Sequence, residues 1–295
     1  MAPATVPSPS ISVIIPHYAD LENLDRCLQS LATQTKRPSC EIIVGDNNSP
    51  VGASAVAETI ASRASLVTET ERGAGPARNA AVSVASGEIL AFIDADCIAD
   101  PNWLENGIAA LKKWDIVGGK VNVTGPCGQE LSGAEAFEKV FAFDNENYVT
   151  TKGFTITGNL FCARRTFDQV GLFANGVSED MEWCHRARDM GLKIGYCEDA
   201  IIGHAARKDW NELKKKWKRL NREGYELLRQ KRFGTLLWLV RTAALPLSIF
   251  AHLPRAVTSA ALSARRDRLA AAYMLVKLRL WRFGDGLQLL FRKDV

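Results

Sequence analysis

The stretch Gly87-Glu88-Ile89-Leu90-Ala91-Phe92-Ile93-Asp94-Ala95-Asp96 decides the fold of this chain. Its apolar run predicts a short buried strand that ends in two carboxylates. Residues i and i+2 of an extended chain point the same way, so Asp94 and Asp96 are expected to face one site at the carboxyl edge of a sheet, where open α/β sheets bind ligands. Neighbouring carboxylates repel each other unless a cation lies between them, and such oxygen ligands suit Mg²⁺ or Mn²⁺. The alternative is a solvated turn, where Asp is common.

Strand and helix patterns alternate around this stretch. β-Branched residues at 11–15 stop at a proline, apolar residues recur at helical spacing over 21–34, and a second strand at 41–44 ends in turn residues. The segment 73–79 then opens a helix that has Pro76 in its first turn. This alternation predicts an α/β fold with a mostly parallel sheet flanked by helices. Beyond Asp96, we expect helices at 101–114, 131–148 and 178–191, and strands at 116–123 and 200–204.

Composition sets the class of protein and the compartment. With 295 residues, 47% of them hydrophobic, the chain is long enough for one large domain, or for a domain and an appendage. The seven cysteines form no Cys-x-x-Cys pair and are odd in number, which indicates reduced thiols in a cytosolic compartment. Residues 1–10 are rich in Pro, Ser and Ala and are expected to form a disordered lead-in.

Charge divides the chain into two parts. Residues 1–206 contain 16 Lys and Arg against 26 Asp and Glu, a net charge of −10. Residues 207–295 contain the remaining 21 against 7, a net charge of +14. The division predicts an acidic catalytic body over 11–206 and a basic tail that meets an anionic surface.

The tail contains three amphipathic stretches. Tryptophans and leucines from Trp210 to Leu227 step by three and four between lysines and arginines, the pattern of an interfacial membrane helix. The apolar segment 236–253 is interrupted by Arg241, Pro246 and His252, which favours an in-plane or re-entrant segment. In a third run, at 269–290, the arginines 268, 279 and 282 are expected to turn away from the apolar face.

A different arrangement of the tail is also consistent with its pattern. The helices can instead pack on one another in a soluble bundle, or on a second copy as a homo-oligomer. No nucleic-acid partner is expected, because the aromatic residues lie with the leucines and not among the cations.

Four motifs in order give the catalytic body a resemblance to a known family. Ile14-Ile15-Pro16-His17-Tyr18, Asp46-Asn47-Asn48-Ser49, Gly75-Pro76-Ala77-Arg78-Asn79 and Asp94-Ala95-Asp96 resemble the motifs of family 2 glycosyltransferases with the GT-A fold. The resemblance covers residues 11–205; Ala19 and Asn47-Asn48 depart from the residues that the family commonly has. It implies a nucleoside-diphosphate sugar donor, UDP-linked, and Mn²⁺ or Mg²⁺ as cofactor.

The resemblance implies roles at the nucleotide. Asp46 would accept an N–H from uracil, and Arg78 would reach a base carbonyl or a phosphate oxygen. Asp94 would lie near the ribose, and Asp96 would bind the metal together with His204. A surface cation is the alternative for Arg78, and a lone structural histidine the alternative for His204. The implied nucleotide-binding set is Pro16, His17, Tyr18, Asp46, Arg78, Asp94, Ala95 and Asp96.

The resemblance also implies a catalytic base and contacts to the sugars. Asp180 would remove the proton of the acceptor hydroxyl, although Glu179 and Asp180 also suit the first turn of a helix that Ser178 caps. Trp183 would stack on an acceptor sugar, or belong to the core. Gly158, Asn159 and Glu179 would line the site of the donor sugar and acceptor.

The resulting hypothesis is an inverting glycosyltransferase at the cytoplasmic face of the inner membrane. Its acceptor would be a lipid-linked saccharide in surface polysaccharide assembly. One alternative transfers the sugar to polyprenyl phosphate, for which Arg164, Arg165 or Arg207 would bind the acceptor phosphate. Another is a catalytically silent nucleotide-sugar-binding membrane scaffold.

Overall fold

The computed structural model describes residues 10–34, 40–125, 130–176 and 178–291. Apart from Ser10, the predicted lead-in lies outside these residues. The chain divides into two compact units. The sheet unit draws on Met1–Asn122 and Asp144–His204, and the helical unit on Val123–Phe143 and Ala205–Val295.

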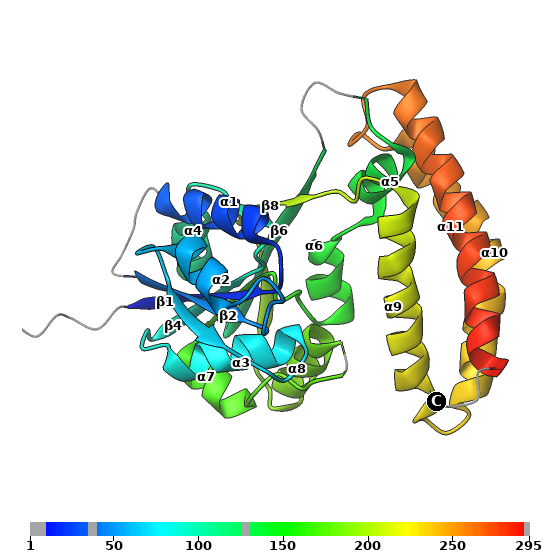
Figure 1. The fold of residues 1–295 in the computed structure, drawn as a ribbon. Coiled ribbons are helices and arrows are strands. Elements are labelled where there is room, and N and C mark those ends of the chain that lie inside the picture. The colour runs from blue at the N-terminus through cyan, green and yellow to red at the C-terminus, as the bar shows by residue number, and fades with distance from the viewer. Residues whose placement is uncertain (1–9, 35–39, 126–129, 177, 292–295) are drawn as a thin grey trace, which may run out of the picture. The chain divides into compact units, whose positions relative to one another are not determined.

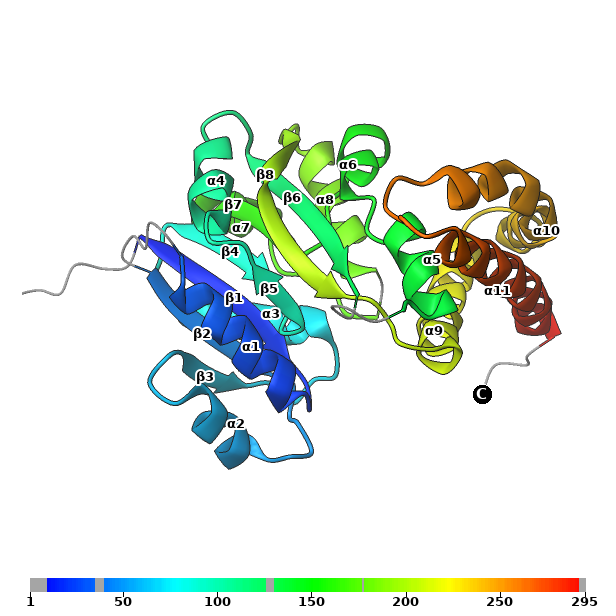
Figure 2. The same ribbon diagram turned by 90° about the horizontal axis from the view of Figure 1, so that it is seen from above.

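An eight-stranded sheet organises the sheet unit (Figures 1 and 2). Its strands are β1 (Ile11–His17), β2 (Cys40–Asp46), β3 (Ser65–Thr68), β4 (Ile89–Ile93), β5 (Cys97–Ala99), β6 (Ile116–Thr124), β7 (Asn159–Ala163) and β8 (Ile194–Ala205). They lie in the order β3-β2-β1-β4-β7-β6-β8-β5.

The two halves of the sheet differ in strand direction. β1 pairs in parallel with β2 and β4, and β2 pairs in parallel with β3, as the strand–helix alternation predicts. β7 runs antiparallel to both β4 and β6, and β5 runs antiparallel to β8. The predicted α/β sheet with flanking helices is confirmed, and its second half makes the sheet mixed.

Helices cover both faces of the sheet. They are α1 (Leu21–Ala32), α2 (Ala53–Ile60), α3 (Ala74–Val84), α4 (Trp103–Ala110), α6 (Asn145–Asn147), the π-helix η1 (Tyr148–Lys152), α7 (Arg164–Val170) and α8 (Glu179–Asp189). α1 and α4 lie on one face and α3, α7 and α8 on the other (Figure 1). Ile14, Phe92, Leu160 and Trp183 belong to one buried cluster, so strands and helices share a core.

Helix α1 illustrates how the local sequence sets an element. Asp20 caps its N-terminus by accepting a hydrogen bond from the Asn23 amide at 3.1 Å. Leu24, Leu28 and Leu31 recur on one face and are almost completely buried. The helix therefore buries the stripe that its periodicity predicts.

The helical unit consists of α5 (Gly133–Phe141), α9 (Trp210–Arg229), α10 (Gly234–Thr258) and α11 (Arg265–Phe291). The three long helices lie side by side (Figures 1 and 2). Ser132 and Glu135 form a capping box at the start of α5. Phe137 of α5 and Leu213 of α9 pack with Leu275 and Leu278 of α11 in one core.

The structure differs from the helix predicted at 131–148. α5 ends at Phe141 because Ala142 is extended and Phe143 has a positive φ of 54°, which no α-helix contains. The chain then begins α6 at Asn145 in the other unit. By its contacts, Val123–Phe143 groups with the tail and not with the rest of residues 11–206.

The tryptophans of α9 point into the helical unit. The Trp210 ring meets the Trp281 ring edge-on with centroids 5.9 Å apart, and the Arg282 guanidinium lies 3.9 Å from the centroid of Trp217. Both tryptophans are half-buried and pack against the core of the helical unit, which is the alternative arrangement given above; their membrane-interface role stays a prediction. Arg282, expected to turn away from the apolar face, is 6% exposed.

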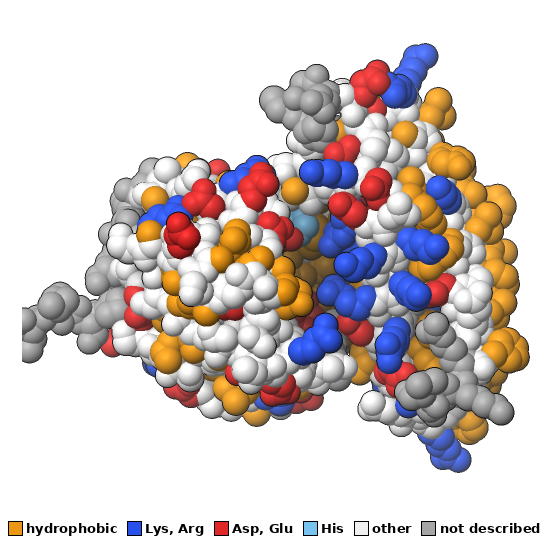
Figure 3. Space-filling model, viewed as in Figure 1, with side chains coloured by type: hydrophobic (Ala, Val, Ile, Leu, Met, Phe, Trp, Pro, Cys, Tyr) orange, Lys and Arg blue, Asp and Glu red, His pale blue; other side chains and the backbone are white. Residues whose placement is uncertain are grey.

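Helix α10 carries more exposed large apolar side chains than any other described helix of the helical unit. Within the described part of the chain, it is the one helix that by length and composition alone is able to cross a membrane, and 17% of its apolar window is buried. It runs as a helix through Pro246 and Pro254. Figure 3 shows basic side chains over α9 and a hydrophobic strip along the edge that α10 and α11 form. The exposed large residues of α10 are Leu236, Leu237, Leu239, Val240, Leu247, Phe250 and Val257.

Candidate active site

The ends of three parallel strands form one edge of the sheet unit. Because β1, β2 and β4 run in the same direction, their last residues His17 and Asp46 and the following Asp94 lie along one edge. Tyr18, directly after β1, is 55% exposed there. The predicted position of the nucleotide motifs at the carboxyl edge agrees with this arrangement.

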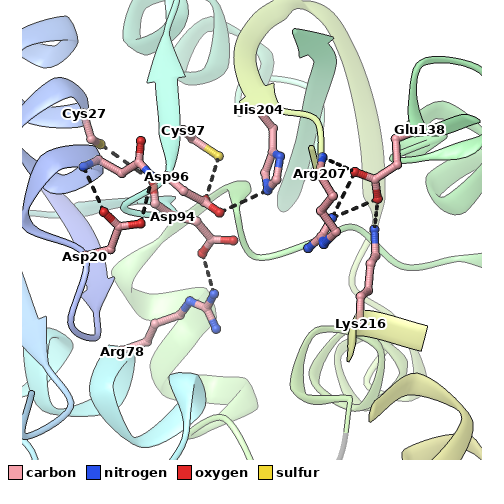
Figure 4. Close-up of polar contacts among 11 residues, drawn as sticks. Asp20, Cys27, Arg78, Asp94, Asp96, Cys97, Glu138, His204, Arg207 and Lys216 are labelled. Atoms are coloured by element: carbon pink, nitrogen blue, oxygen red, sulfur yellow. Dashed lines mark hydrogen bonds and ion pairs between the residues drawn. The ribbon is translucent and has the colours of Figure 1, made fainter. Parts of the chain in front are cut away.

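A buried arginine joins the first motif carboxylate to helix α8. Arg78 of α3 is 3% exposed and donates to Asp94 Oδ1 at 2.6 Å and to Glu179 Oε1 at 2.8 Å (Figure 4). Burial disfavours its charge, but the two carboxylates outweigh burial and raise the pKa of the guanidinium. The alternative of a surface cation is therefore wrong.

Strand β7 brings a glycine against Asp94. The antiparallel register places Asn159 opposite Ile93, so Gly158 lies beside the motif. A Cβ at Gly158 would lie 2.7 Å from Asp94 Oδ2, closer than real Cβ contacts. Glycine at this position is therefore what allows the Asp94 carboxylate to keep its place.

Asp96 and His204 meet because β5 pairs with β8. The register sets Cys97 opposite His204, and His204 Nε2 lies 3.2 Å from Asp96 Oδ2 (Figure 4). The Asp96 side chain is 45% exposed, and that of His204 is 10% exposed. The two residues predicted to share a metal, 108 positions apart in sequence, are thus neighbours.

The donor set at this pair fits a divalent cation. A carboxylate oxygen and an imidazole nitrogen suit Mn²⁺, and Mg²⁺ accepts one or two carboxylates plus phosphate oxygens. Among the residues that the structure describes, no group of three or more His, Cys, Asp and Glu is arranged to hold a metal. Diphosphate oxygens and water are suitable further ligands for a cation at Asp96 and His204.

Asp180 is a half-buried carboxylate in the first turn of α8. Its Oδ1 accepts hydrogen bonds from the Met181 amide at 2.7 Å and the Ser178 hydroxyl at 3.0 Å. Burial and the neighbouring charge of Glu179 raise its pKa, against the opposing effect of these hydrogen bonds and of Arg78. A carboxylate whose pKa is raised is better matched to accepting a proton than an ordinary aspartate.

Asp46 is held by its neighbours at the end of β2. Its carboxylate accepts hydrogen bonds from the Ser49 hydroxyl at 2.5 Å and the Ser49 amide at 3.0 Å, and His17 Nδ1 lies 2.8 Å from Oδ1. Burial raises the pKa of Asp46, but the bonds from Ser49 and His17 outweigh burial and lower it. Ser49 stands in a motif quoted above, yet its part in fixing this turn was missed.

Two predicted sugar contacts are corrected by burial. Trp183 is 0% exposed, packs against Phe167 and Phe173, and donates its indole N–H to the Gly171 carbonyl. Asn159 is also 0% exposed; its amide group accepts from Trp103 Nε1 and donates to two backbone carbonyls. Both side chains belong to the core and neither reaches a bound sugar.

Two of the cations suggested for a polyprenyl phosphate bind partners within their own unit. Arg164 donates to the carbonyls of Ala85 and Gly87, which precede β4 and so lie at the opposite end from Asp94. Arg207 pairs with Glu138 within the helical unit. This removes the reason for assigning an acceptor phosphate to them.

Comparisons with known proteins agree on one class. The family model described as glycosyl transferase family 2 matches residues 12–171. The chain is 32% identical over 219 residues to glycosyltransferase AglE of Haloferax volcanii, covering 71% of each protein. It is 34% identical over 107 residues to the UDP-Glc:α-D-GlcNAc-diphosphoundecaprenol β-1,3-glucosyltransferase WfgD of Escherichia coli, covering 36% of this chain and 42% of that relative.

A solved structure shares the fold. The mannosyltransferase PcManGT from Pyrobaculum calidifontis, in complex with GDP-Man and Mn²⁺, superposes with a TM-score of 0.63 at 20% sequence identity. The match covers 97% of this chain and 88% of that one. The likeness supports the GT-A fold of the sheet unit and the presence of C-terminal helices.

Proposed function

This chain belongs to glycosyl transferase family 2 and is a glycosyltransferase, and from that premise we propose that it is an inverting, metal-dependent enzyme. It moves a sugar from a nucleoside diphosphate, UDP in the first instance, to a hydroxyl of a lipid-linked saccharide. The observation that carries the proposal is the connected carboxylate set, in which Arg78 ties Asp94 to Glu179 directly beside Asp180.

Asp180 acts as the general base. Its pKa is raised by burial and by Glu179, so the carboxylate has a stronger tendency to take the proton of the acceptor hydroxyl as that oxygen attacks the anomeric carbon. Attack from the side opposite the diphosphate inverts the configuration at that carbon. Glu179 and Arg78 position Asp180 through the start of α8.

Asp96 and His204 hold the metal, which when bound supplies positive charge against the negative charge on the departing diphosphate. Asp94 lies near the ribose, and its oxygen is fixed by Arg78. Tyr18 and Pro16 line the base beside His17 and Asp46. The Mn²⁺ bound by PcManGT supports metal dependence.

The acceptor proposal draws on the relatives and on the tail. WfgD is named for a diphosphoundecaprenol-linked acceptor. The exposed apolar surface of α10 and the charge of +14 over 207–295 support attachment to the anionic cytoplasmic face of a membrane. This face carries the phosphate-linked lipids on which such an enzyme would act.

The deciding experiment pairs an activity assay with a binding assay. Nucleoside diphosphate release is measured from a panel of donors with Mn²⁺, with and without a lipid-linked acceptor, and donor binding is measured by calorimetry. The wild-type chain should release product from at least one donor, faster with acceptor. Asp96→Ala should lose Mn²⁺-dependent donor binding while its circular dichroism stays unchanged. Undiminished donor binding in this variant would remove the metal from the proposal.

A further inference from the structure

The helical unit contains a buried arginine that takes no part in the active site. Arg282 of α11 is 6% exposed; its Nε donates to Asn221 Oδ1 at 3.0 Å, and its guanidinium lies 3.9 Å from the centre of the Trp217 ring. No described residue forms an ion pair with it at salt-bridge distance. A buried cation without a direct counter-ion is costly, so its retention calls for a physical reason.

Two further arginines add to the positive charge at this place. Arg279 lies on the same helix, three residues before Arg282, and Arg241 of α10 lies over the Trp238 ring. Burial, Arg279 and Arg241 together lower the pKa of Arg282 to about 9, and Asp285 opposes them. Asp285 already accepts a hydrogen bond from Asn221 at 2.8 Å. Two cations therefore act on Arg282, and Asp285 is the one carboxylate that offsets them there.

Unpartnered polar atoms accompany these arginines. Among the described residues, the buried side-chain atoms without a hydrogen-bond partner include Arg279 Nε, Trp217 Nε1 and Thr242 Oγ1, which come from α11, α9 and α10. Thr242 packs on Gly286, one turn after Arg282. Buried donors in native proteins are nearly always satisfied, so these three indicate an acceptor that occupies the site in the working protein.

Another buried charged residue of the helical unit, Glu138, has direct counter-ions. Glu138 of α5, 1% exposed as a side chain, pairs with Arg207 at 2.9 Å and with Lys216 at 2.8 Å (Figure 4). The Lys216 side chain, although it belongs to the basic residues of α9, is only 17% exposed. The surplus of donors at Arg282 is therefore specific to its surroundings and not a general property of the unit.

We propose that Arg282, Arg279 and Arg241, with the Trp217 indole and the Thr242 hydroxyl, form a binding site for a phosphate or diphosphate group. The guanidinium fork matches phosphate oxygens in pairs, and an anion with several acceptor oxygens satisfies donors from three helices at once. Building on the proposed function, the group is the phosphate-bearing end of the lipid-linked acceptor.

The surface beside the site favours a lipid source for this group. Arg241 follows Leu239 and Val240 on α10, which are 42% and 60% exposed, and Leu247 and Phe250 further along this helix are 70% and 77% exposed. A phosphate held at the arginines would therefore leave an attached isoprenoid chain next to an apolar helix surface. Free phosphate offers the same oxygens but gains nothing from this surface.

Calorimetric titrations test the site without the catalytic metal. Inorganic phosphate, inorganic diphosphate, farnesyl diphosphate and farnesol are titrated into Asp96→Ala protein in the presence of a chelator, so that no probe binds through Mn²⁺. The same titrations are repeated with three double variants, in which Arg279→Gln, Arg282→Lys or Trp217→Phe is added singly to Asp96→Ala. Arg222→Gln, an exposed α9 arginine, is the matched control.

Farnesyl diphosphate should bind, and Arg279→Gln and Arg282→Lys should each weaken it about 10- to 100-fold, the effect of losing charge-assisted hydrogen bonds. Trp217→Phe keeps the stacked ring and removes one donor, so it should weaken binding by several-fold. Arg222→Gln should bind like its parent. Tighter binding of farnesyl diphosphate than of inorganic diphosphate supports the lipid source, and equal binding supports the anion site with a soluble source.

The proposal is overturned if no phosphate-bearing probe binds, or if Arg279→Gln and Arg282→Lys bind like the parent with unchanged circular dichroism. Farnesol that binds as well as farnesyl diphosphate overturns it too, because the phosphate would then contribute nothing. Donor binding with Mn²⁺, measured on protein with Asp96 intact, is the separate readout of the proposed function. If donor binding is observed and farnesyl diphosphate binding is not, the phosphate site has failed and the proposed function stands. If farnesyl diphosphate binds and the donor does not, the proposed function has failed.

Discussion

The sheet unit and the helical unit differ in how their buried charges are compensated. In the sheet unit, Arg78 is buried between two carboxylates that stay 36% and 25% exposed, so positive charge is enclosed and negative charge faces the site. In the helical unit, Glu138 is enclosed by two cations, while Arg282 and Arg279 form no ion pair with a carboxylate at salt-bridge distance among the described residues, and Arg279 Nε has no hydrogen-bond partner there. Carboxylate oxygens thus face the active site of the sheet unit. In the helical unit, by contrast, the buried groups include more arginine N–H donors than acceptors.

This difference indicates complementary ligands. Exposed carboxylates suit a cation and the sugar hydroxyls, whereas a surplus of guanidinium groups suits an anion. The net charges of −10 and +14 over 1–206 and 207–295 follow the same division. Each prediction below changes one or more side chains within one unit.

The largest effect is expected at Asp180. Asp180→Asn should reduce turnover about 10²- to 10⁴-fold, the usual contribution of a positioned base, with donor affinity little changed. The wild-type rate should rise with pH through the raised pKa of Asp180, because only the carboxylate accepts the proton, and the Asn variant should lose this dependence. The rate profile in steady-state assays checks both.

Stability provides the control for this variant. A raised carboxyl pKa in the folded state favours the neutral form, so its contribution to stability is present at low pH and is lost as pH rises through that pKa. Asp180→Asn should therefore melt no earlier than wild type at neutral pH. Asp189→Asn, an exposed acid at the end of the same helix, should leave turnover unchanged. If Asp180→Asn turned over as fast as wild type, Asp180 would not be the catalytic base, and its role would be limited to the first turn of α8.

The next largest effect is expected at Glu138 in the helical unit. Glu138→Gln leaves Arg207 and Lys216 without their counter-ion and should destabilise the unit by about 3–5 kcal/mol, measured by urea unfolding. Burial raises the pKa of Glu138, but its two cations outweigh burial and lower it. Its stabilisation is therefore present above its unfolded pKa of about 4.3 and lost as pH falls through the folded pKa.

Glu226→Gln is the matched control for Glu138→Gln. Glu226 pairs with Arg229 at 2.7 Å, but both side chains are about 40% exposed, so its loss should cost no more than about 1 kcal/mol. Donor binding should survive in both variants, because Asp96 and His204 belong to the sheet unit. If the two variants lost the same free energy of unfolding, the buried pairing of Glu138 with Arg207 and Lys216 would not contribute more than an exposed ion pair.

A smaller effect is expected at Gly158. In Gly158→Ala the new methyl group displaces the Asp94 carboxylate, and misplacement of a site group by about 1 Å costs about 10²-fold in rate. Gly284→Ala in α11 meets nothing within 4 Å and should leave kcat/KM unchanged. An alanine variant as active as wild type would show that Asp94 has freedom to move away from Gly158.

The smallest effect per residue concerns the exposed lysines of α9. Lys214, Lys215 and Lys218 are exposed, and each should add about 1 kcal/mol of attraction to an anionic membrane, screened by salt. Changing all three to Gln, with Lys216 left intact, should release the protein from anionic vesicles in a flotation assay. Activity on a short water-soluble acceptor should persist. If wild-type protein did not bind anionic vesicles in this assay, the proposed attachment to a membrane would be wrong.

Local sequence was sufficient for the parallel half of the sheet and for its motifs. β1, β2 and β4 are contiguous apolar runs ended by turn residues, and parallel strands necessarily bring their last residues to one edge. That Asp46, Asp94 and Asp96 lie at strand ends therefore followed from periodicity alone. The family followed from four motifs in order, and the family model confirms it.

Other features depended on pairings between distant segments. The antiparallel register of β5 and β8 brings His204 to Asp96, and that of β7 brings Gly158 to Asp94; no local pattern encodes a register. Trp183 and Asn159 lie in motif positions that suggested contacts to the sugars, but both side chains are completely buried in the core of the sheet unit.

The helical unit shows most clearly what the sequence left undetermined. Its amphipathic periods predicted helices in the tail but not which of their faces would pack together, because apolar stripes fit a membrane and a neighbouring helix equally well. Packing buried Arg282, half-buried Trp210 and Trp217 against their neighbours, and left Leu247 and Phe250 exposed. Sequence determined that this protein has a glycosyltransferase sheet and a basic helical tail; only the tertiary structure decided which charges the tail encloses, since that depends on three helices meeting.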